Sequence, residues 1–361
     1  MPNPLNWTGV YSILLALNIY QFCPRIICVN NSSHLTRGYS IAVTSAVILS
    51  TTAIFIRYLT QTYAIPALVL AFWRAGFVVL TLFAVLGVFR PALLKVEKRH
   101  LAYLLAYGFL LAVFNSLWTL SVALNGAAVA TVLVYCSAAF TALLGWWLLK
   151  ERLDWVKGLV IVVTLTGCAL VSNALDVRAW GANFSGILTG VLAGLGYALY
   201  SLMGRSASQR GLSPWTTLTY IFIFAAVFLL GFNLFSGGFI PGAAIYPADL
   251  LWLGDAWLGW GVLFLLAAGP TVAGFGLYLV SLSYLPSSVA NLIVTLEPAF
   301  TAVIAYFLLG ERLTAIQLLG SLLILGGVAF LRIYEDRLVT EKLPAQTSAA
   351  QLALEVESEV S

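Results

Sequence analysis

The sequence predicts an all-α integral membrane protein whose ten transmembrane helices form two inverted-topology five-helix repeats. Composition gives the class, because 61% of the 361 residues are hydrophobic and 9% are charged, whereas soluble domains carry about 25% charged residues. Apolar stretches give the helices, since about 20 apolar residues cross a bilayer core of about 30 Å. A similar segment that recurs 160 residues later gives the repeat.

The predicted spans fill most of the chain. They lie near residues 40–59, 65–89, 101–123, 126–149, 154–172, 184–204, 213–235, 258–283, 288–309 and 314–333. Residues 40–172 therefore form the first predicted repeat and residues 184–333 the second. Residues 334–361 are polar and are predicted to be a disordered cytoplasmic tail.

Residues 1–39 are a poorly defined N-terminal extension. Within them, Leu5–Cys23 is uncharged but interrupted by Asn, Thr, Ser and Gln residues, which suits a spanning helix poorly. The segment also lacks the basic start and small-residue cleavage site of a signal peptide. A loosely attached or wrongly assigned extension, an interfacial helix and an extra span all remain open.

The internal repeat is clearest at the ends of the fourth and ninth spans. AFTALLGWWLLKERL at 139–153 aligns with AFTAVIAYFLLGERL at 299–313, with nine of fifteen positions identical, and the register continues without a gap on both sides. Each copy holds five predicted helices, so the second copy enters the membrane from the opposite side. Such inverted repeats are the architecture on which many secondary transporters build alternating access.

The basic residues predict the orientation. If the first span starts in the cytoplasm, the cytoplasmic side carries fourteen Lys and Arg residues and the outer side three. Basic residues in short loops stay inside, so both ends of the ten-helix unit are predicted to be cytoplasmic. The longest outer loop is then 236–257.

Glu297 is the first candidate for function. It is the one charge in the apolar run 288–309, and at about 1.5 Å per residue it lies roughly 14 Å deep. An ionisable group at that depth is expected to face a cavity or a partner rather than lipid. Pro298 follows directly and predicts a helix break at the carboxyl group. The alternative is a structural ion pair that locks two helices together.

Arg74 is the second candidate, because it lies nine residues into the second span, again about 14 Å deep. It needs a carboxylate, backbone carbonyls or an anionic substrate group, and a purely structural arginine bound to helix-end carbonyls is the alternative. Arg57 lies close to a span end, where a long basic side chain is expected to snorkel to the interface.

Five further side chains are candidate cavity walls. The repeat pairs Trp118 with Tyr278 and Tyr135 with Thr295, while Asn115 lies one helical turn before Trp118. Aromatic rings with a polar group suit a cavity for amphipathic solutes, although helix packing explains such positions equally well. Small residues allow helices to approach closely, and glycines cluster at Gly190, Gly194, Gly196, Gly274, Gly276, Gly326 and Gly327. Gly269 and Pro270 raise the question of a break or hinge in the eighth span, which the sequence leaves undecided. The charged ERL ends of the fourth and ninth spans are interpreted as structural.

These features resemble the drug/metabolite transporter superfamily, EamA type. The resemblance covers about residues 40–333 and is specific in the fourth span and in the ninth, which reads LEPAFTAVIAYFLLGERLT. It implies secondary transport, usually export, of small metabolites across a bacterial cytoplasmic membrane. The family commonly has a proline in both repeat-end helices and often an arginine in the second helix. Here Pro298 pairs with Ala138 and Glu297 with Ser137, so we expect one coupling site rather than two.

The preferred function is export of an amino-acid-like or amphipathic solute by proton-coupled alternating access, and two alternatives are kept beside it. These are a facilitative or exchange transporter of the nucleotide-sugar or organophosphate kind, and a non-transporting intramembrane protein. An intramembrane enzyme would need paired carboxylates, a Ser/His set or a metal cluster, and the span interiors hold one carboxylate and no histidine. The expected partners are a small-molecule substrate, the lipid bilayer and protons. No nucleic acid, cofactor or metal is expected, a homodimer is left open, and the expected location is the bacterial inner membrane.

Overall fold

The structure is a computed structural model that describes residues 28–149, 155–171, 177–235, 239–281, 284–285, 293–331 and 333–334. Every regular element in these ranges is helical. Two ranges outside them carry predictions made above, the first 27 residues of the extension and the tail from residue 335.

The helices follow the predicted spans closely. They are α2 (Cys28–Thr62), α3 (Ala67–Phe89), α4 (Lys98–Asn125), α5 (Ala127–Val134), α6 (Ser137–Leu149), α7 (Trp155–Val171), α8 (Val177–Gln209), α9 (Pro214–Phe235), α10 (Trp257–Leu266), α11 (Phe275–Ser281) and α13 (Glu297–Leu309), joined by the short elements η2 (Pro91–Leu94), η3 (Pro247–Leu251) and η4 (Ala267–Gly274). A further apolar helix covers Ala315–Leu331.

Six helices in the described part of the chain are long and apolar enough to cross a bilayer. They are Thr36–Thr62, Ala67–Phe89, Lys98–Asn125, Phe184–Gly204, Pro214–Phe235 and Trp257–Ser281. Shorter apolar helices cover the other four predicted spans, at Ala127–Thr141, Gly158–Val171, Glu297–Leu309 and Ala315–Leu331. The chain is therefore a multi-pass membrane protein.

Several predicted spans differ in detail from the observed helices, among them the sixth, predicted at 184–204, where α8 runs from Val177 to Gln209. The first was predicted from residue 40, but α2 already begins at Cys28, and residues 28–39 contain no proline that would stop a helix there. The fourth predicted span is two helices, α5 and α6. The eighth is interrupted by η4, a π-helix with Pro270 inside it, which answers the open question about Gly269 and Pro270.

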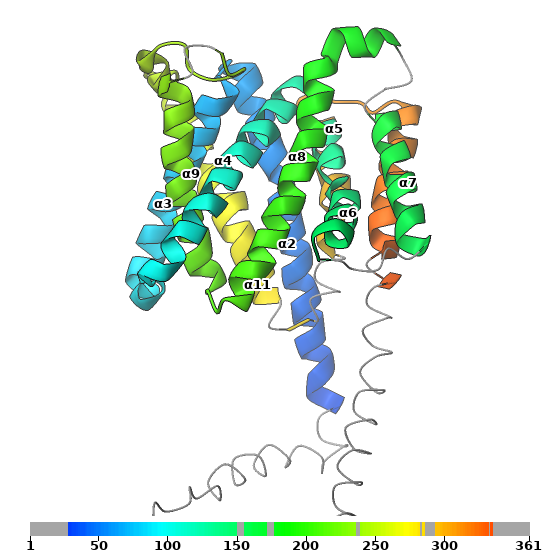
Figure 1. The fold of residues 1–361 in the computed structure, drawn as a ribbon, viewed down its shortest axis with the longest axis horizontal. Helices are drawn as coiled ribbons and strands as arrows, with labels where there is room; N and C mark the ends of the chain where they lie inside the picture. Colours follow the sequence, from blue (N-terminus) through cyan, green and yellow to red (C-terminus); the bar gives the residue numbers. More distant parts are fainter. Residues whose placement is uncertain are drawn as a thin grey trace, which may run out of the picture.

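Helices of the two predicted repeats pack against each other throughout the bundle. Figure 1 shows α3, α4 and α9 grouped on one side, α7 at the opposite edge, and α2 and α8 between them. α4 packs against α8 and α9, and α13 of the second predicted repeat packs against α2 and α5 of the first. This exchange of neighbours leaves the space between the repeats surrounded by helices from both.

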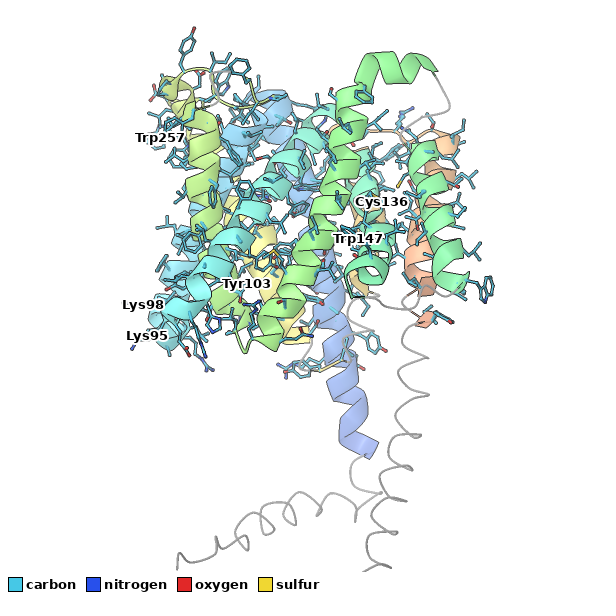
Figure 2. All side chains as sticks on the ribbon, in the orientation of Figure 1. Lys95, Lys98, Tyr103, Cys136, Trp147 and Trp257 are labelled. Carbon is cyan, nitrogen blue, oxygen red and sulfur yellow. The ribbon has the colours of Figure 1, made fainter. Side chains whose placement is uncertain are left out.

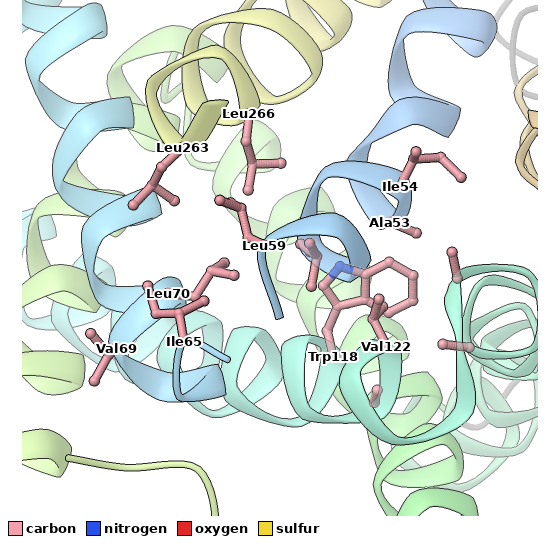
Figure 3. Close-up of a cluster of buried hydrophobic side chains, with 14 of the residues drawn as sticks. Ala53, Ile54, Leu59, Ile65, Val69, Leu70, Trp118, Val122, Leu263 and Leu266 are labelled. Atoms are coloured by element: carbon pink, nitrogen blue, oxygen red, sulfur yellow. The ribbon is translucent and has the colours of Figure 1, made fainter. Parts of the chain in front are cut away.

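The largest apolar cluster lies between α2, α3, α4 and α10. Figure 3 shows Leu59, Leu70, Leu263 and Leu266 close together, with Trp118 of α4 beside them. Leu59, Leu70, Leu263 and Leu266 are completely buried. This cluster fixes the position of α4 at Trp118, which becomes important at the cavity described below.

The predicted glycine contacts are largely present. A Cβ atom at Gly190, Gly194, Gly196, Gly274, Gly276 or Gly327 would lie within 4 Å of another helix, whereas Gly326 has no such neighbour. The closest approach is at Gly194 of α8, where a Cβ would lie 2.4 Å from Cys136 Sγ. These glycines therefore let side chains of neighbouring helices pack closely, and at Gly194 and Gly196 the neighbouring backbone also comes within 3.5 Å of the added Cβ.

The loop between α9 and α10 is tied to the bundle. Asn233 donates to the carbonyls of Leu68 at 3.2 Å and Leu229 at 2.8 Å, and it accepts from the Ala244 amide at 2.9 Å. Trp73 donates from Nε1 to the Leu250 carbonyl at 2.6 Å. In Figure 2, Trp257 marks this end of the bundle, and Lys95 and Lys98 mark the opposite end.

Candidate functional site

A cavity of about 140 Å³ lies between helices of both predicted repeats. By this measure a water molecule needs about 10–15 Å³, so the cavity has room for several waters or one small solute. Its polar wall includes Arg74, Asn115, Tyr135 and Glu297, and its aromatic wall includes Trp118. The structure thus brings together five of the seven side chains that the sequence selected as charged or cavity-lining candidates.

Glu297 enters the cavity at the first residue of α13, with Pro298 at the next position. The Tyr135 hydroxyl lies 3.2 Å from Glu297 Oε2 and 3.0 Å from the carbonyl oxygen of Val294. The carboxyl group therefore sits at a helix start, where a negative charge is favoured by the unpaired amides. Tyr135 links this position to the end of α5.

Both central helices break at equivalent positions of the repeat. α5 ends at Val134, a turn covers Tyr135 and Cys136, and α6 starts at Ser137. In the second copy a turn covers Thr295 and Leu296, and α13 starts at Glu297. Shifting the first break by 160 residues gives the second. We attributed the break at Glu297 to Pro298, but Ala138 occupies that position in the first copy, so proline is not required.

Tight turn bonds account for the first break. The amides of Tyr135 and Cys136 donate to the carbonyls three residues earlier, at 3.0 and 3.1 Å, which is the pattern of a 3₁₀ turn. Gly194 of α8 packs directly against Cys136 and Leu133 at this point. The break is therefore held by tertiary packing as well as by local sequence.

Arg74 is almost completely buried, with 4% of its surface exposed. Its Nη2 donates to Oδ1 of Asn115, while its Nε and the Asn115 Nδ2 have no hydrogen-bond partner. Among the described residues the ion pairs within 4.0 Å are Arg57–Glu311 and Arg99–Glu97, so Arg74 and Glu297 share the cavity without forming one. The predicted alternatives of a helix-locking ion pair and of an arginine on helix-end carbonyls are both absent from this arrangement.

Two predicted wall residues lie elsewhere. Tyr278 and Thr295 are not among the residues that line the cavity, although Thr295 is buried. Tyr278 follows the π-helix η4, and a π turn takes more residues than an α turn. The regular helix α4 has no such turn before Trp118, so the repeat does not carry the direction of the Trp118 side chain over to Tyr278.

Sequence reasoning missed several lining residues that the repeat could have found. Asn115 pairs with Phe275 and Leu111 with Thr271 under the 160-residue shift, and all four line the cavity. The other lining residues that were not selected are Leu49, Thr52, Phe114, Thr131, Val134, Tyr197, Tyr200, Phe222 and Val294. Threonines and aromatics are frequent in apolar spans, so their type alone does not separate a cavity wall from helix packing.

Arg57 was expected to snorkel to the membrane interface, but in the structure its side chain is bound within the protein. Its Nε lies 3.4 Å from Glu311 Oε1, and its Nη1 donates to the carbonyl of Ala123. Glu311 in turn accepts from the backbone amides of Ala127 at 2.9 Å and Ala128 at 3.1 Å. The charged end of the second repeat therefore caps the start of α5 in the first repeat. Within the described residues no three His, Cys, Asp or Glu side chains gather as a metal site.

Comparison with known proteins matches both halves of the chain to the same family. The EamA-like transporter family matches twice, over residues 36–173 and 184–333. An "Uncharacterized transporter" of Archaeoglobus fulgidus is 26% identical over 293 residues, which are 81% of this chain and 94% of that protein. "Threonine/homoserine exporter RhtA" of Escherichia coli is 28% identical over 235 residues, which are 64% of this chain and 71% of that protein.

A solved structure titled "Crystal structure of protein" has the same fold. It superposes with a TM-score of 0.51 over 82% of this chain and 98% of that chain, at 17% identity. The relatives and the family model describe transporters, not enzymes. With both matched regions covering most of its helices, this chain belongs to the EamA-like transporter family.

Proposed function

We propose that this transporter exports small amino-acid-like or amphipathic metabolites by proton-coupled alternating access. The observation that supports this most is the cavity in which Glu297 and Arg74 lie on different predicted repeats, beside two helix breaks. Broken helices around a site between repeats are a feature of secondary transporters, because the halves can rock around such a site.

Glu297 is the proposed coupling group. The titratable and charged side chains that share its cavity are Arg74, Tyr135, Tyr197 and Tyr200. A carboxyl group there can carry a proton in one state and meet a cationic substrate group in another. The Tyr135 hydroxyl suits both states, because a hydroxyl can donate to a carboxylate or accept from a carboxylic acid while it donates to the Val294 carbonyl.

The membrane arrangement completes the proposal. We propose ten spans in two inverted repeats, residues 40–172 and 184–333, in a bacterial inner membrane with both ends cytoplasmic. The fourteen-to-three bias of basic residues supports this orientation. The two breaks related by the 160-residue shift support the repeat.

The substrate proposal rests on cavity size and on a relative. A cavity of about 140 Å³ suits a small solute, and the related protein RhtA is named for threonine and homoserine export. Exchange of nucleotide sugars is less favoured, because a phosphate-bearing substrate would call for several basic groups. Among the described lining residues, Arg74 is the one basic side chain.

Transport in proteoliposomes tests the function. Labelled amino acids, amines and dyes are offered to the purified full-length chain with and without an imposed pH gradient. We expect wild-type transport of at least one amino-acid-like solute to follow the gradient, and Glu297→Gln to transport without responding to it. Glu97→Gln is the matched control, because Glu97 is an exposed carboxylate at a helix start.

Two outcomes contradict the proposal. If wild type and Glu297→Gln respond equally to the gradient, Glu297 is not the coupling group. If the wild-type chain moves none of the solutes in either direction, export of small metabolites is wrong. Counterflow exchange needs no net proton movement, so its partial survival in Glu297→Gln would show that the variant is folded.

A further inference from the structure

Arg74 and Asn115 line the same cavity, and each of them has one buried hydrogen-bond donor without a partner. Arg74 is 4% exposed and Asn115 is 2% exposed, and neither Arg74 Nε nor Asn115 Nδ2 has a partner in the described structure. Buried donors are nearly always satisfied by protein, water or a ligand. Two of them on adjacent side chains of one cavity therefore point to a ligand with acceptor oxygens.

The bond between these residues fixes which way the amide faces. Because guanidinium groups only donate, Arg74 Nη2 must meet the carbonyl oxygen of Asn115 and not its nitrogen. The Asn115 amide hydrogens are thus directed away from Arg74 and remain without a partner. Arg74 in this way sets the orientation of Asn115 as well as supplying the positive charge.

A second buried asparagine shows what a structural role looks like in this protein. Asn233 is also 2% exposed, but both its donor and its acceptor are used, in bonds to the backbone at Leu68, Leu229 and Ala244. Asn115 makes one bond, to Arg74, and leaves its amide nitrogen unpartnered. Structural locking of helices therefore explains Asn233 and does not explain Asn115.

We propose that Arg74 and Asn115 form the subsite that recognises a carboxylate group of the substrate. The planar guanidinium fork with a neighbouring amide donor matches the two oxygens of a carboxylate. The acidic and tyrosine groups of Glu297 and Tyr135, in the same cavity, are then available to the ammonium end of a zwitterion. This inference deepens the proposed function and depends on it for the direction and driving force of transport, but not for binding.

The subsite predicts selectivity between an acid and its ester. The twenty L-amino acids and their methyl esters are added separately to the purified full-length chain, and thermal unfolding is followed. We expect at least one amino acid to raise the unfolding temperature of the wild type by several degrees, while its methyl ester does not. Asn115→Leu and Arg74→Lys are expected to weaken this preference. In each variant the ratio of the affinity for the amino acid to the affinity for its methyl ester should fall at least tenfold.

Asn115→Asp gives an independent test. The new carboxylate occupies the place of the proposed ligand group beside Arg74, so this variant is expected to unfold at a higher temperature without ligand and to lose the response to amino acids. Asn233→Leu is the matched control, which is expected to unfold at a lower temperature and to keep the preference for acid over ester.

The outcomes separate this inference from the proposed function. Three results would overturn the carboxylate subsite. In the first, amino acids and their esters stabilise the protein equally, and in the second, none of the amino acids stabilises it. In the third, Asn115→Leu and Asn115→Asp both keep the wild-type preference for acid over ester. Selective binding of acids without any transport in proteoliposomes would instead support the subsite and contradict the exporter function.

Discussion

Arg57 of α2 and Glu311, which follows α13, form an ion pair with 3.4 Å between Nε and Oε1. Glu311 also accepts from the amides of Ala127 and Ala128 at the start of α5. One carboxylate therefore connects the first helix, the start of the fourth predicted span and the end of the ninth. All three are expected at the outer end of the bundle, so this contact joins the two repeats on one side of the membrane.

Glu311→Gln is expected to destabilise the protein by about 1–2 kcal/mol, because an amide replaces one capping acceptor with a donor and removes the charge from the helix start. The measurement is thermal unfolding of the purified chain in detergent. Glu97→Gln is the control, since its ion pair with Arg99 is exposed and exposed pairs contribute at most about 1 kcal/mol. Equal effects of the two substitutions would show that the Glu311 contact has no special weight.

The sequence predicted those site residues whose polar groups are energetically costly within an apolar span. Glu297, Arg74 and Asn115 stand out for that reason, and each lines the cavity. The repeat added Tyr135 and Trp118 to these. By contrast, the partner of Arg57 could not be predicted, because an ion pair with Glu311 depends on how the repeats pack and not on local pattern.

The positions of the helices could likewise be predicted only in part from the sequence. Hydropathy located the spans, since apolar length is a direct requirement of the bilayer. The break at Tyr135 and Cys136 had no proline to indicate it, and only the equivalence with Thr295 and Leu296 relates it to Pro298. The π-helix at Ala267–Gly274 has no counterpart in α4. The repeat therefore predicted the fold better than it predicted side-chain directions.

Gly194→Ala is expected to destabilise the protein by about 1–3 kcal/mol, because overpacking forces neighbouring groups apart. The added methyl would lie 2.4 Å from Cys136 Sγ, at the break between α5 and α6. Gly76→Ala in α3 is the matched control, since its Cβ would meet nothing within 4 Å. Thermal unfolding of both variants measures the effect, and tolerance of Ala at Gly194 would mean that this contact is looser than the structure indicates.

Cysteines introduced at Ile245 and Lys95 are expected to react from opposite sides of the membrane. Both positions are exposed, and they lie in the loops near Trp257 and Lys98, which mark opposite ends of the bundle in Figure 2. The background lacks Cys23, Cys28, Cys136 and Cys168. A membrane-impermeant maleimide applied to intact cells should label the position at 245 and spare the position at 95. Labelling of both would contradict the proposed orientation.

Tyr135→Phe is the remaining prediction, and it concerns the hydroxyl that lies 3.2 Å from Glu297 Oε2 and 3.0 Å from the Val294 carbonyl. A phenyl ring keeps the packing of Tyr135 but removes the group that can accompany both forms of the carboxyl. We expect slower transport and a weaker response to a pH gradient, by about five- to thirtyfold in rate if the bond contributes about 1–2 kcal/mol.

A double-mutant cycle separates this effect from a general loss of packing. If the hydroxyl acts through Glu297, Tyr135→Phe should change transport strongly in the wild type and hardly at all in Glu297→Gln, giving a coupling free energy of about 0.5–3 kcal/mol. The measurement is initial transport rate in proteoliposomes for the four proteins. Additive effects would mean that Tyr135 shapes the cavity independently of Glu297, and the bond across the two helix breaks would then have no part in coupling.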